Sequence, residues 1–214
     1  MNNFTRMEIV GVFRSGTNAM LETLERGYYC IPTFNQYFWK HCLPPSTEVN
    51  LIPRDTAIIC MVRDPVEWNR SIFRFWHTRR KELTPSLELG KFIREPLLVY
   101  DNSKGLSDIH YHFNTPIDYW NKYYYAWYFW KNIRDQLLFV RLEDFETKPE
   151  SVLLTIERKF SLRRKTTWSP TLPPSRVGPL VPSSIEGLIT EYQSSDINFI
   201  QTYCLPNLKS VFNY

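Results

Sequence analysis

Two glycines and the polar residues that accompany them form the segment of this 214-residue chain with the clearest chemical potential. Gly11-Val-Phe-Arg-Ser-Gly-Thr-Asn18 comes at the end of the apolar run Met7–Phe13 and leads into Ala19–Leu24, an order that predicts strand, glycine loop and helix. In this arrangement backbone N–H groups and the positive end of the helix dipole can hold a phosphate. The segment therefore predicts an anion site near the start of the chain.

The two glycines have the spacing of a nucleotide-triphosphate P-loop, but the residues that act on a terminal phosphate are missing. Thr17 and Asn18 stand where that motif has Lys and Ser or Thr. Kinases and NTPases use that lysine on the terminal phosphates and that hydroxyl on Mg²⁺. Arg14 is the only cation in the loop sequence, so we expect phosphate binding without γ-phosphate chemistry.

A second candidate phosphate clamp follows the apolar run Thr56–Val62. This uncharged run is typical of a buried parallel strand, and Pro65 suits the first turn of a helix that begins after it. Arg63 precedes this turn and Ser71 lies two helical turns along. A guanidinium and a hydroxyl suit a phosphate monoester, because the fork offers two donors and the hydroxyl a third. The alternative is an ordinary strand-to-helix turn with Arg63 capped by Asp64.

Together the two segments resemble the P-loop sulfotransferases, which use 3′-phosphoadenosine-5′-phosphosulfate (PAPS). In that family the first loop holds the 5′-phosphosulfate, and a later Arg-x-Pro…Ser segment holds the 3′-phosphate. The first motif is matched by Arg14, Ser15, Gly16, Thr17 and Asn18, and the second by Arg63 and Ser71. Phe13 departs from the proline often found there. The resemblance covers roughly residues 1–75 well and 139–150 moderately.

The resemblance implies an α/β fold of three layers, αβα, with a parallel central sheet and a P-loop-like phosphate-binding loop. It implies PAPS as the donor, adenosine 3′,5′-bisphosphate as the product and no metal. A loose match at Arg176-Val-Gly178, in the Pro-rich segment 166–182, implies that this segment covers the cofactor and that Arg176 contacts the 3′-phosphate.

His41, preceded by Lys40, is the catalytic candidate. The segment Tyr37–Pro45 resembles the element that ends the second strand in the family. Transfer to a hydroxyl needs a base, and histidine is the natural one near neutral pH; Lys40 or Arg14 would stabilise the developing charge. Alternatively, His41 is a hydrogen-bonded structural residue at a strand end. The base would then be His110 or His112, or a carboxylate such as Glu67 or Asp101.

The remaining pattern predicts a single domain over residues 1–214, with elements that alternate as in a βαβ series. The predicted strands are Glu8–Phe13, Gln36–His41, Ala57–Val62 and Gln136–Asp144, and the predicted helices are Thr17–Tyr28, Pro65–Thr78, Thr115–Arg134, Pro149–Phe160, Ser184–Tyr192 and Asp196–Tyr203. Residues 83–114 hold prolines, glycines and scattered aromatics, which predict a variable insert. It forms either an acceptor lid or a surface loop.

The helix predicted over Thr115–Arg134 has aromatic residues on all sides, which implies burial on more than one side. Core packing accounts for most of them. Trp120, Asn121, Tyr124 and Trp127, about one turn apart, could instead line a wall on which a sugar stacks. This possibility and the Trp39-Lys40-His41 resemblance to polysaccharide-modifying members favour a carbohydrate acceptor.

Composition is that of an ordinary globular protein, with 43% hydrophobic and 22% charged residues and a formal net charge of +4. No run of about eighteen apolar residues and no apolar signal core are present. The four cysteines are irregularly spaced, which suits a reducing compartment. We therefore predict a cytoplasmic protein without membrane insertion. No nucleic-acid-binding module accompanies the basic residues, so no nucleic-acid partner is predicted.

The sequence thus predicts a sulfotransferase that acts on a hydroxyl of a small-molecule or glycan acceptor. Two alternatives stay open. One is a kinase-like phosphotransferase with a degenerate loop, against which Thr17 argues. The other is a non-catalytic nucleotide- or glycan-binding protein, against which the joint presence of Arg14, His41, Arg63 and Ser71 argues.

Overall fold

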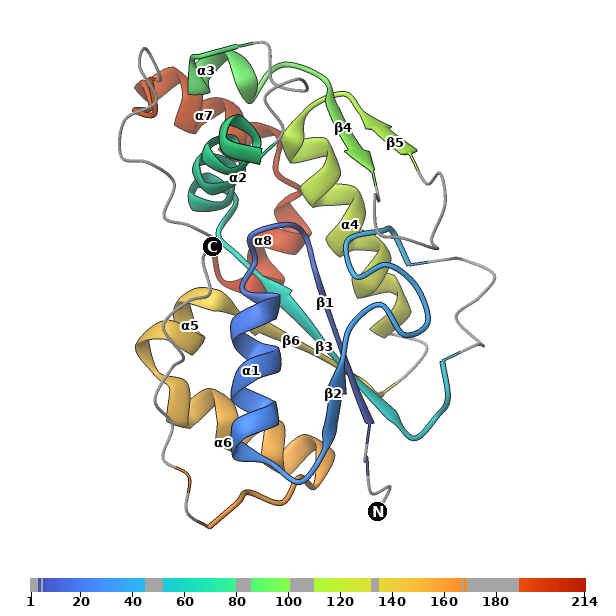
Figure 1. Cartoon of the computed structure of the whole chain (residues 1–214). Coiled ribbons are helices and arrows are strands. Elements are labelled where there is room, and N and C mark those ends of the chain that lie inside the picture. Colours follow the sequence, from blue (N-terminus) through green and yellow to red (C-terminus); the bar gives the residue numbers. More distant parts are fainter. Residues whose placement is uncertain are drawn as a thin grey trace. The chain divides into compact units, whose positions relative to one another are not determined.

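The computed structural model describes residues 4, 6–44, 52–79, 86–100, 110–131, 135–166, 168 and 189–214, and Figure 1 labels their elements. They belong to two compact units, each made of two chain segments: Met1–Arg63 with Tyr125–Arg176, and Asp64–Tyr124 with Val177–Tyr214. The chain first passes from one unit to the other directly after Arg63. The site described below lies in the first unit.

The first unit is built on a parallel sheet of four strands (Figure 1). The strand order is β2 (Ile31–Thr33), β1 (Arg6–Gly11), β3 (Thr56–Val62) and β6 (Leu137–Arg141), and all three neighbouring pairs are parallel. Every residue of β3 is buried, as its uncharged run predicts. Because parallel strands end at one edge of the sheet, the segments that follow β1 and β3 meet there.

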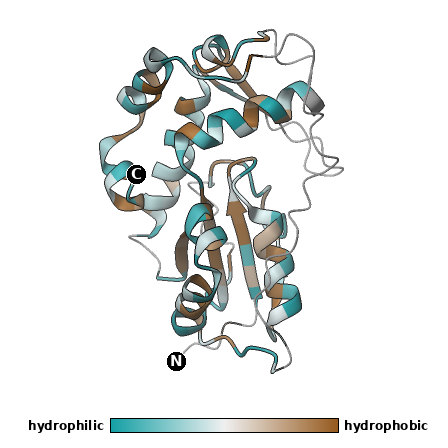
Figure 2. Cartoon of the chain, turned by 90° about the vertical axis from the view of Figure 1, so that its left-hand side faces the viewer, coloured by the Kyte–Doolittle hydropathy of each residue, from teal (hydrophilic) through white to brown (hydrophobic). Residues whose placement is uncertain are grey.

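Helices cover both faces of this sheet. One face packs against α1 (Thr17–Gly27), α5 (Leu142–Thr147) and α6 (Pro149–Phe160), in a core that includes Met7 and Ile59. On the other face, Lys131 at the end of α4 (Pro116–Lys131) lies over the Phe139 ring at 5.8 Å. Figure 2 shows hydrophobic residues along the central strands. The predicted three-layer α/β architecture is confirmed.

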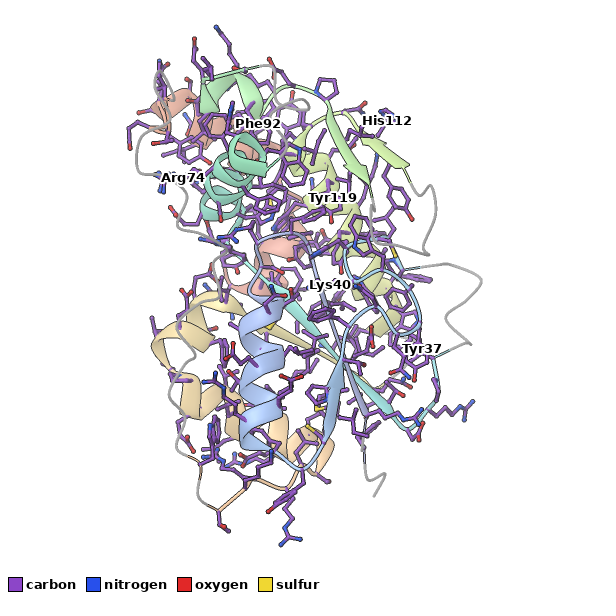
Figure 3. All side chains as sticks on the ribbon, viewed as in Figure 1. Tyr37, Lys40, Arg74, Phe92, His112 and Tyr119 are labelled. Carbon is purple, nitrogen blue, oxygen red and sulfur yellow. The ribbon has the colours of Figure 1, made fainter. Side chains whose placement is uncertain are left out.

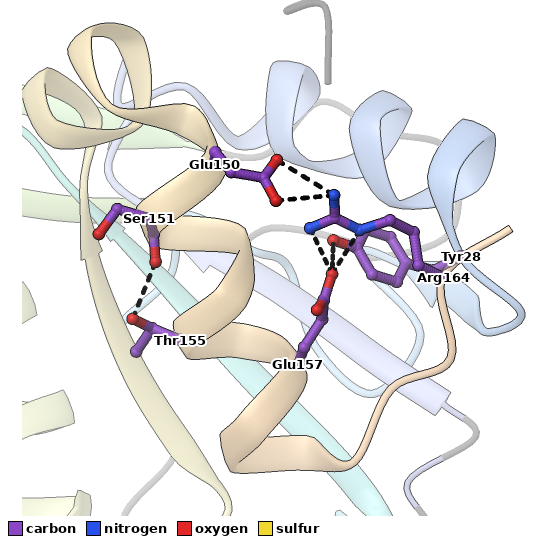
Figure 4. A network of polar contacts seen from close by, with 6 residues as sticks. All are labelled: Tyr28, Glu150, Ser151, Thr155, Glu157 and Arg164. Atoms are coloured by element: carbon purple, nitrogen blue, oxygen red, sulfur yellow. Dashed lines mark hydrogen bonds and ion pairs between the residues drawn. The ribbon is translucent and has the colours of Figure 1, made fainter. Parts of the chain in front are cut away.

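A polar network lies at the C-terminal end of α1 (Figure 4). The Tyr28 hydroxyl donates to Glu157 Oε1 at 2.6 Å. Arg164 donates from Nε to the same oxygen at 2.6 Å and from Nη1 to Glu150 Oε1 at 2.8 Å. These bonds tie the end of α1 to α6 and to the segment that follows α6.

The second unit has its own aromatic core. Its elements are α2 (Pro65–Arg79), α3 (Leu89–Phe92), the antiparallel pair β4 (Leu97–Tyr100) and β5 (His110–Phe113), the first half of α4, α7 (Ser194–Tyr203) and α8 (Pro206–Phe212). Trp68 of α2 packs beside Tyr119 of α4, with ring centroids 6.0 Å apart. Arg94, after α3, pairs with Asp196 of α7 at 2.6 Å. None of the described helices combines the length and apolar character that a membrane span requires.

The sequence predicted most of these elements, but the strand at Gln36–His41 is wrong. Residues 36–41 form bends and a turn, and β2 lies earlier, at Ile31–Thr33. Asn35, two residues after β2 ends, has a left-handed backbone (φ 64°), which interrupts the extended conformation that a strand needs. Its side chain then accepts a hydrogen bond from Lys40 N–H at 2.9 Å.

Three smaller corrections concern the ends and the insert. The strand predicted over Gln136–Asp144 ends at Arg141, because Leu142 already begins α5. The insert 83–114 contains α3 and the β4–β5 pair in its described part. Of the helix predicted over Ser184–Tyr192, the described residues 189–192 are not helical, since Ile189 bonds to the backbone of Leu87 and Leu89 instead. Helix α8 was not predicted.

Candidate anion-binding and catalytic site

The loop between β1 and α1 requires both of its glycines. A Cβ on Gly11 would lie 2.3 Å from Ser15 Oγ and 2.8 Å from the Met61 carbonyl oxygen of the neighbouring strand. Gly16 has φ 90°, a conformation that other residues rarely adopt, and a Cβ there would meet Leu142 Cδ1 at 2.5 Å. The glycine spacing in the sequence therefore reflects close packing of the loop against β3 and the start of α5.

The loop leaves the first turn of α1 without a side-chain cap. Gly16 occupies the N-cap position, and Met20 N–H to the Gly16 carbonyl is an early helical bond at 3.1 Å. Ser15 instead turns inward, where its N–H and hydroxyl both donate to the Val12 carbonyl, at 3.3 and 2.8 Å. A glycine cap supplies no acceptor to the first N–H groups of the helix, which is the geometry suited to an anion.

Lys40 brings a cation to this first turn from a different segment. Its ammonium donates to Asn18 Oδ1 at 2.8 Å and lies 3.6 Å from the centroid of the Phe34 ring. Figure 3 labels it near the beginning of α1. Burial lowers the pKa of Lys40 to about 8, and the nearby charge of Glu8 opposes this shift. The loop thus receives an ammonium although position 17 of the sequence is threonine.

His41 is held directly on the loop. Its Nδ1 lies 2.6 Å from the Gly11 carbonyl oxygen, and since a carbonyl only accepts, Nδ1 carries the proton and Nε2 is the basic nitrogen of the neutral ring. The ring stacks on Phe13 with centroids 4.1 Å apart. Burial, with the charge of Lys40, lowers the pKa of His41 to about 3. At neutral pH the imidazole is therefore uncharged, with its lone pair on Nε2, and the burial that keeps it neutral also makes Nε2 a weak base in the protein without ligand.

Arg63, the residue of the second predicted clamp that lies in the first unit, contacts the glycine loop. Its Nη1 donates to the Arg14 carbonyl at 3.0 Å, which brings the end of β3 to the glycine loop. Arg14 has a left-handed backbone, with φ 64°. Burial and the positive charge of Arg63 lower the pKa of Arg14. Two guanidiniums and an ammonium at one loop form an arrangement that a multiply charged anion would stabilise.

Glu8 belongs to this region and sequence reasoning did not single it out. It lies inside β1 and is fully buried. Its carboxylate accepts hydrogen bonds from the Thr33 hydroxyl at 2.7 Å and from Gln36 N–H at 3.2 Å. Burial raises the pKa of Glu8, and these hydrogen bonds oppose the shift. The available signal was an acidic residue within the apolar run Met7–Phe13.

Three residues of α4 that the sequence suggested for an acceptor wall lie in the core of the second unit. Trp120 and Tyr124 are fully buried, and both rings contact Phe212. Asn121 donates to the Tyr203 carbonyl at 2.7 Å and accepts from Leu205 N–H at 3.0 Å. These contacts give the three residues a packing role in the second unit.

The other candidate residues lie elsewhere. Ser71 is half-buried in α2 of the second unit. His112 is exposed on β5, and Glu67 on α2 pairs with Arg70 at 2.8 Å. Arg176 and Asp101 lie outside the described residues, as does the side chain of His110.

Comparison with known proteins gives little at the level of sequence: no family model matches the chain, and no curated protein does either. Among solved structures, that of mouse sulfotransferase SULT7A1 complexed with PAP is similar, with a TM-score of 0.48 and 17% sequence identity. The match covers 98% of this chain and 82% of that chain. A likeness this distant carries no argument about activity, which depends on the chemistry of the site.

Proposed function

We propose that this protein is a PAPS-dependent sulfotransferase that transfers a sulfuryl group to an acceptor hydroxyl. One observation carries the proposal. Lys40, His41 and Arg63, from segments well separated from the loop in the sequence, all hydrogen-bond to residues of the glycine loop, beside Arg14. The arrangement provides cations for an anionic leaving group and a neutral imidazole for a hydroxyl proton.

The buried cations fit a nucleotide that carries several negative charges. Burial lowers the pKa values of both Arg14 and Lys40, so the protein holds these charges at a cost that an anionic ligand would offset. The N–H groups at the start of α1 and Lys40 would hold the 5′ end of the nucleotide. Arg63 would hold the 3′-phosphate, the group to which the family resemblance also assigns Ser71 and Arg176.

PAPS, when bound, supplies the sulfuryl group and a phosphate leaving group. His41 would take the proton of the acceptor hydroxyl at Nε2, while its Nδ1–H bond to Gly11 keeps the ring oriented. Lys40 and Arg14 would stabilise the negative charge that develops on the leaving phosphate. General-base assistance typically contributes about 10²–10⁴-fold to such a rate.

One feature of the sequence bears on the identity of the acceptor. We propose a carbohydrate hydroxyl, on the resemblance of the Trp39-Lys40-His41 segment to polysaccharide-modifying sulfotransferases. The aromatic residues of α4 no longer contribute to this argument. Transfer without metal and a cytoplasmic location remain predictions.

A phosphotransferase is the second candidate, and the position of Lys40 is what favours it. The ammonium at Asn18 could serve the terminal phosphates of ATP in place of the missing P-loop lysine. Against it, Asn18 has no hydroxyl for Mg²⁺.

Ligand-dependent melting separates the two functions. Adenosine 3′,5′-bisphosphate in the presence of EDTA should raise the melting temperature more than ATP with Mg²⁺ does. The reason is that a ligand stabilises the native state more, the more tightly it binds that state. Labelled PAPS and a panel of glycans and small alcohols should then yield a sulfated product. Equal stabilisation by both nucleotides, or phosphate transfer from ATP, would overturn the sulfotransferase proposal.

A further inference from the structure

We propose that Glu8 is a positioning residue, whose buried carboxylate holds the segment 33–36 and thereby sets where Lys40 and His41 lie against the glycine loop. Glu8 lies inside the sheet and acts on Lys40 and His41 through the segment 33–36 rather than through a hydrogen bond to either residue. The proposal rests on the proposed function only for the roles of Lys40 and His41. The anchoring itself is a property of the protein without ligand.

The carboxylate of Glu8 lies inside the sheet. Alternation along β1 puts Glu8 on the sheet face opposite to Met7 and Ile9, with Thr33 and Ile58 as its cross-strand neighbours. A buried carboxylate is expensive unless it is hydrogen-bonded. Here the compensating donors are the Thr33 hydroxyl and Gln36 N–H. The carboxylate and the segment 33–36 therefore stabilise each other.

Residues 34 and 35, which follow Thr33, contact Lys40. Asn35 accepts Lys40 N–H at 2.9 Å, and the Phe34 ring lies 3.6 Å from the Lys40 ammonium. Main chain and side chain of Lys40 are thus both held by residues next to Thr33. Moving 33–36 would move Lys40, and His41 with it.

Lys40 and His41 are also hydrogen-bonded to Gly11, at the end of the strand that contains Glu8. Gly11 N–H donates to the Lys40 carbonyl at 3.2 Å, and His41 Nδ1 donates to the Gly11 carbonyl at 2.6 Å. The path of contacts leaves β1 at Glu8 and returns at Gly11, about 10 Å along the strand by its rise per residue. A strand is stiff over this length, so Glu8 and Gly11 fix the segment between them at two points.

Charge adds a second effect to this anchoring. The charge of Glu8 opposes the fall in the pKa of Lys40 that burial causes. Other charged or titratable groups described near the site include His41 beside Lys40, Arg14 and Arg63 at the loop, Asp64 after Arg63, and, on α1, Glu22, which pairs with Arg26. Among the described residues, Glu8 is an acidic group whose charge acts on Lys40, so its removal should lower the pKa of Lys40 below about 8.

The test uses Glu8→Gln, which keeps size and removes charge, and Thr33→Val, which keeps the carboxylate and removes one donor. With PAPS and a sulfated acceptor, both variants should lose about tenfold or more in kcat while the KM for PAPS changes less than about threefold, because orientation acts mainly in the transition state. Glu8→Gln should also move the alkaline limb of the kcat–pH profile to lower pH. The proposal would be overturned if both variants lost stability, lost kcat/KM only in proportion to that loss, and showed no pH shift for Glu8→Gln. Such a result would show a merely structural role.

Glu157→Gln is the matched control, since Glu157 also accepts a hydroxyl hydrogen bond in the same unit, from Tyr28. It should lower the melting temperature and leave kcat and the pH profile unchanged. A readout independent of activity is the titration of Lys40 followed by NMR in protein with ¹³C-labelled lysine. Glu8→Gln should lower the Lys40 midpoint by about half a unit or more. An unchanged midpoint overturns the link between Glu8 and Lys40 even if the protein transfers sulfate, and a lowered midpoint supports that link even if it does not.

Discussion

The two ends of helix α1 lie in the same unit and use charge in opposite ways. At its C-terminal end, Arg164 lies between the carboxylates of Glu150 and Glu157, and the Tyr28 hydroxyl donates to the second of these (Figure 4). At its N-terminal end, Lys40 and two arginines gather at one loop. The helix of 11 residues separates the two clusters by about 16 Å.

The difference shows which end is built for stability and which for a ligand. Opposite charges pair with one another at the Tyr28 end. Like charges at the loop end repel, as the lowered pKa of Arg14 through burial and Arg63 indicates. Such repulsion persists in a folded protein only where the rest of the fold compensates for it, which is typical of functional sites. Mutations at the two ends should therefore separate stability from binding and turnover.

The largest expected effect is at His41. His41→Ala should lower turnover of PAPS by about 10²–10⁴-fold and leave the affinity for adenosine 3′,5′-bisphosphate near wild type. Because the pKa of His41 is lowered to about 3, its protonation should not shape the rate at neutral pH. The rate should not rise through the ordinary imidazole range near pH 6.5.

Single-turnover rates from about pH 5 to 9 check this prediction. Near-normal turnover in His41→Ala would make His41 structural. The search for the base would then move to His112, Glu67 or residues outside the described part of the chain.

The glycine loop and the Arg63 turn could be predicted because their signals are local. Glycine spacing and the proline after Arg63 fix backbone geometry within a few residues. Glu8 could not be found in this way, since its partners Thr33 and Gln36 are distant in sequence and meet it only through the pairing of β1 with β2. The strand β2 itself has three residues, too few to show a period.

Helix α4 contains a feature that the sequence could not predict. Its aromatic density predicted burial on more than one side, and this is wrong: one face of the helix is buried, whereas Tyr125 and Phe129 on the other side are exposed. The buried rings are those of Tyr119, Trp120, Tyr123, Tyr124, Trp127 and Trp130. The sequence could not show that the polar side chain between two of its rings, that of Asn121, serves the backbone of Tyr203 and Leu205. Which polar groups face a ligand and which satisfy the backbone depends on α7 and α8, and α8 was not predicted.

The next largest effect is at Arg63. Arg63→Ala should weaken binding of adenosine 3′,5′-bisphosphate by about 2–4 kcal/mol, because a desolvated charge-assisted pair is lost. Adenosine 5′-phosphate, which has no 3′ group, should bind with little change. Isothermal titration with both ligands measures the difference. A comparable loss for the two would place Arg63 at the 5′ phosphate, next to Arg14, to whose carbonyl it donates.

The stability of the protein in acid should depend on His41. The folded-state pKa of His41 lies below its unfolded value of 6.5, so its contribution to stability is present above pH 6.5 and is lost as pH falls toward about 3. The reason is that the unfolded chain binds the proton first. Between pH 6.5 and about pH 4 this amounts to roughly 2–3 kcal/mol. Urea unfolding should show that His41→Asn is less sensitive to acid than wild type over this range; equal sensitivity would contradict the neutral, buried imidazole.

The smallest effect is at the other end of α1. Tyr28→Phe keeps the buried ring, which packs edge-on to Trp168 at 5.6 Å, and removes only the hydroxyl that donates to Glu157. Glu157 keeps its bonds to Arg164, so the loss should be about 1 kcal/mol, or about 2–4 °C in melting temperature for a chain of this size. Turnover and bisphosphate affinity should not change, because the hydroxyl lies a helix length from the loop. A variant that weakened nucleotide binding would show that the two ends of α1 are coupled, and the division between a stabilising end and a binding end would no longer hold.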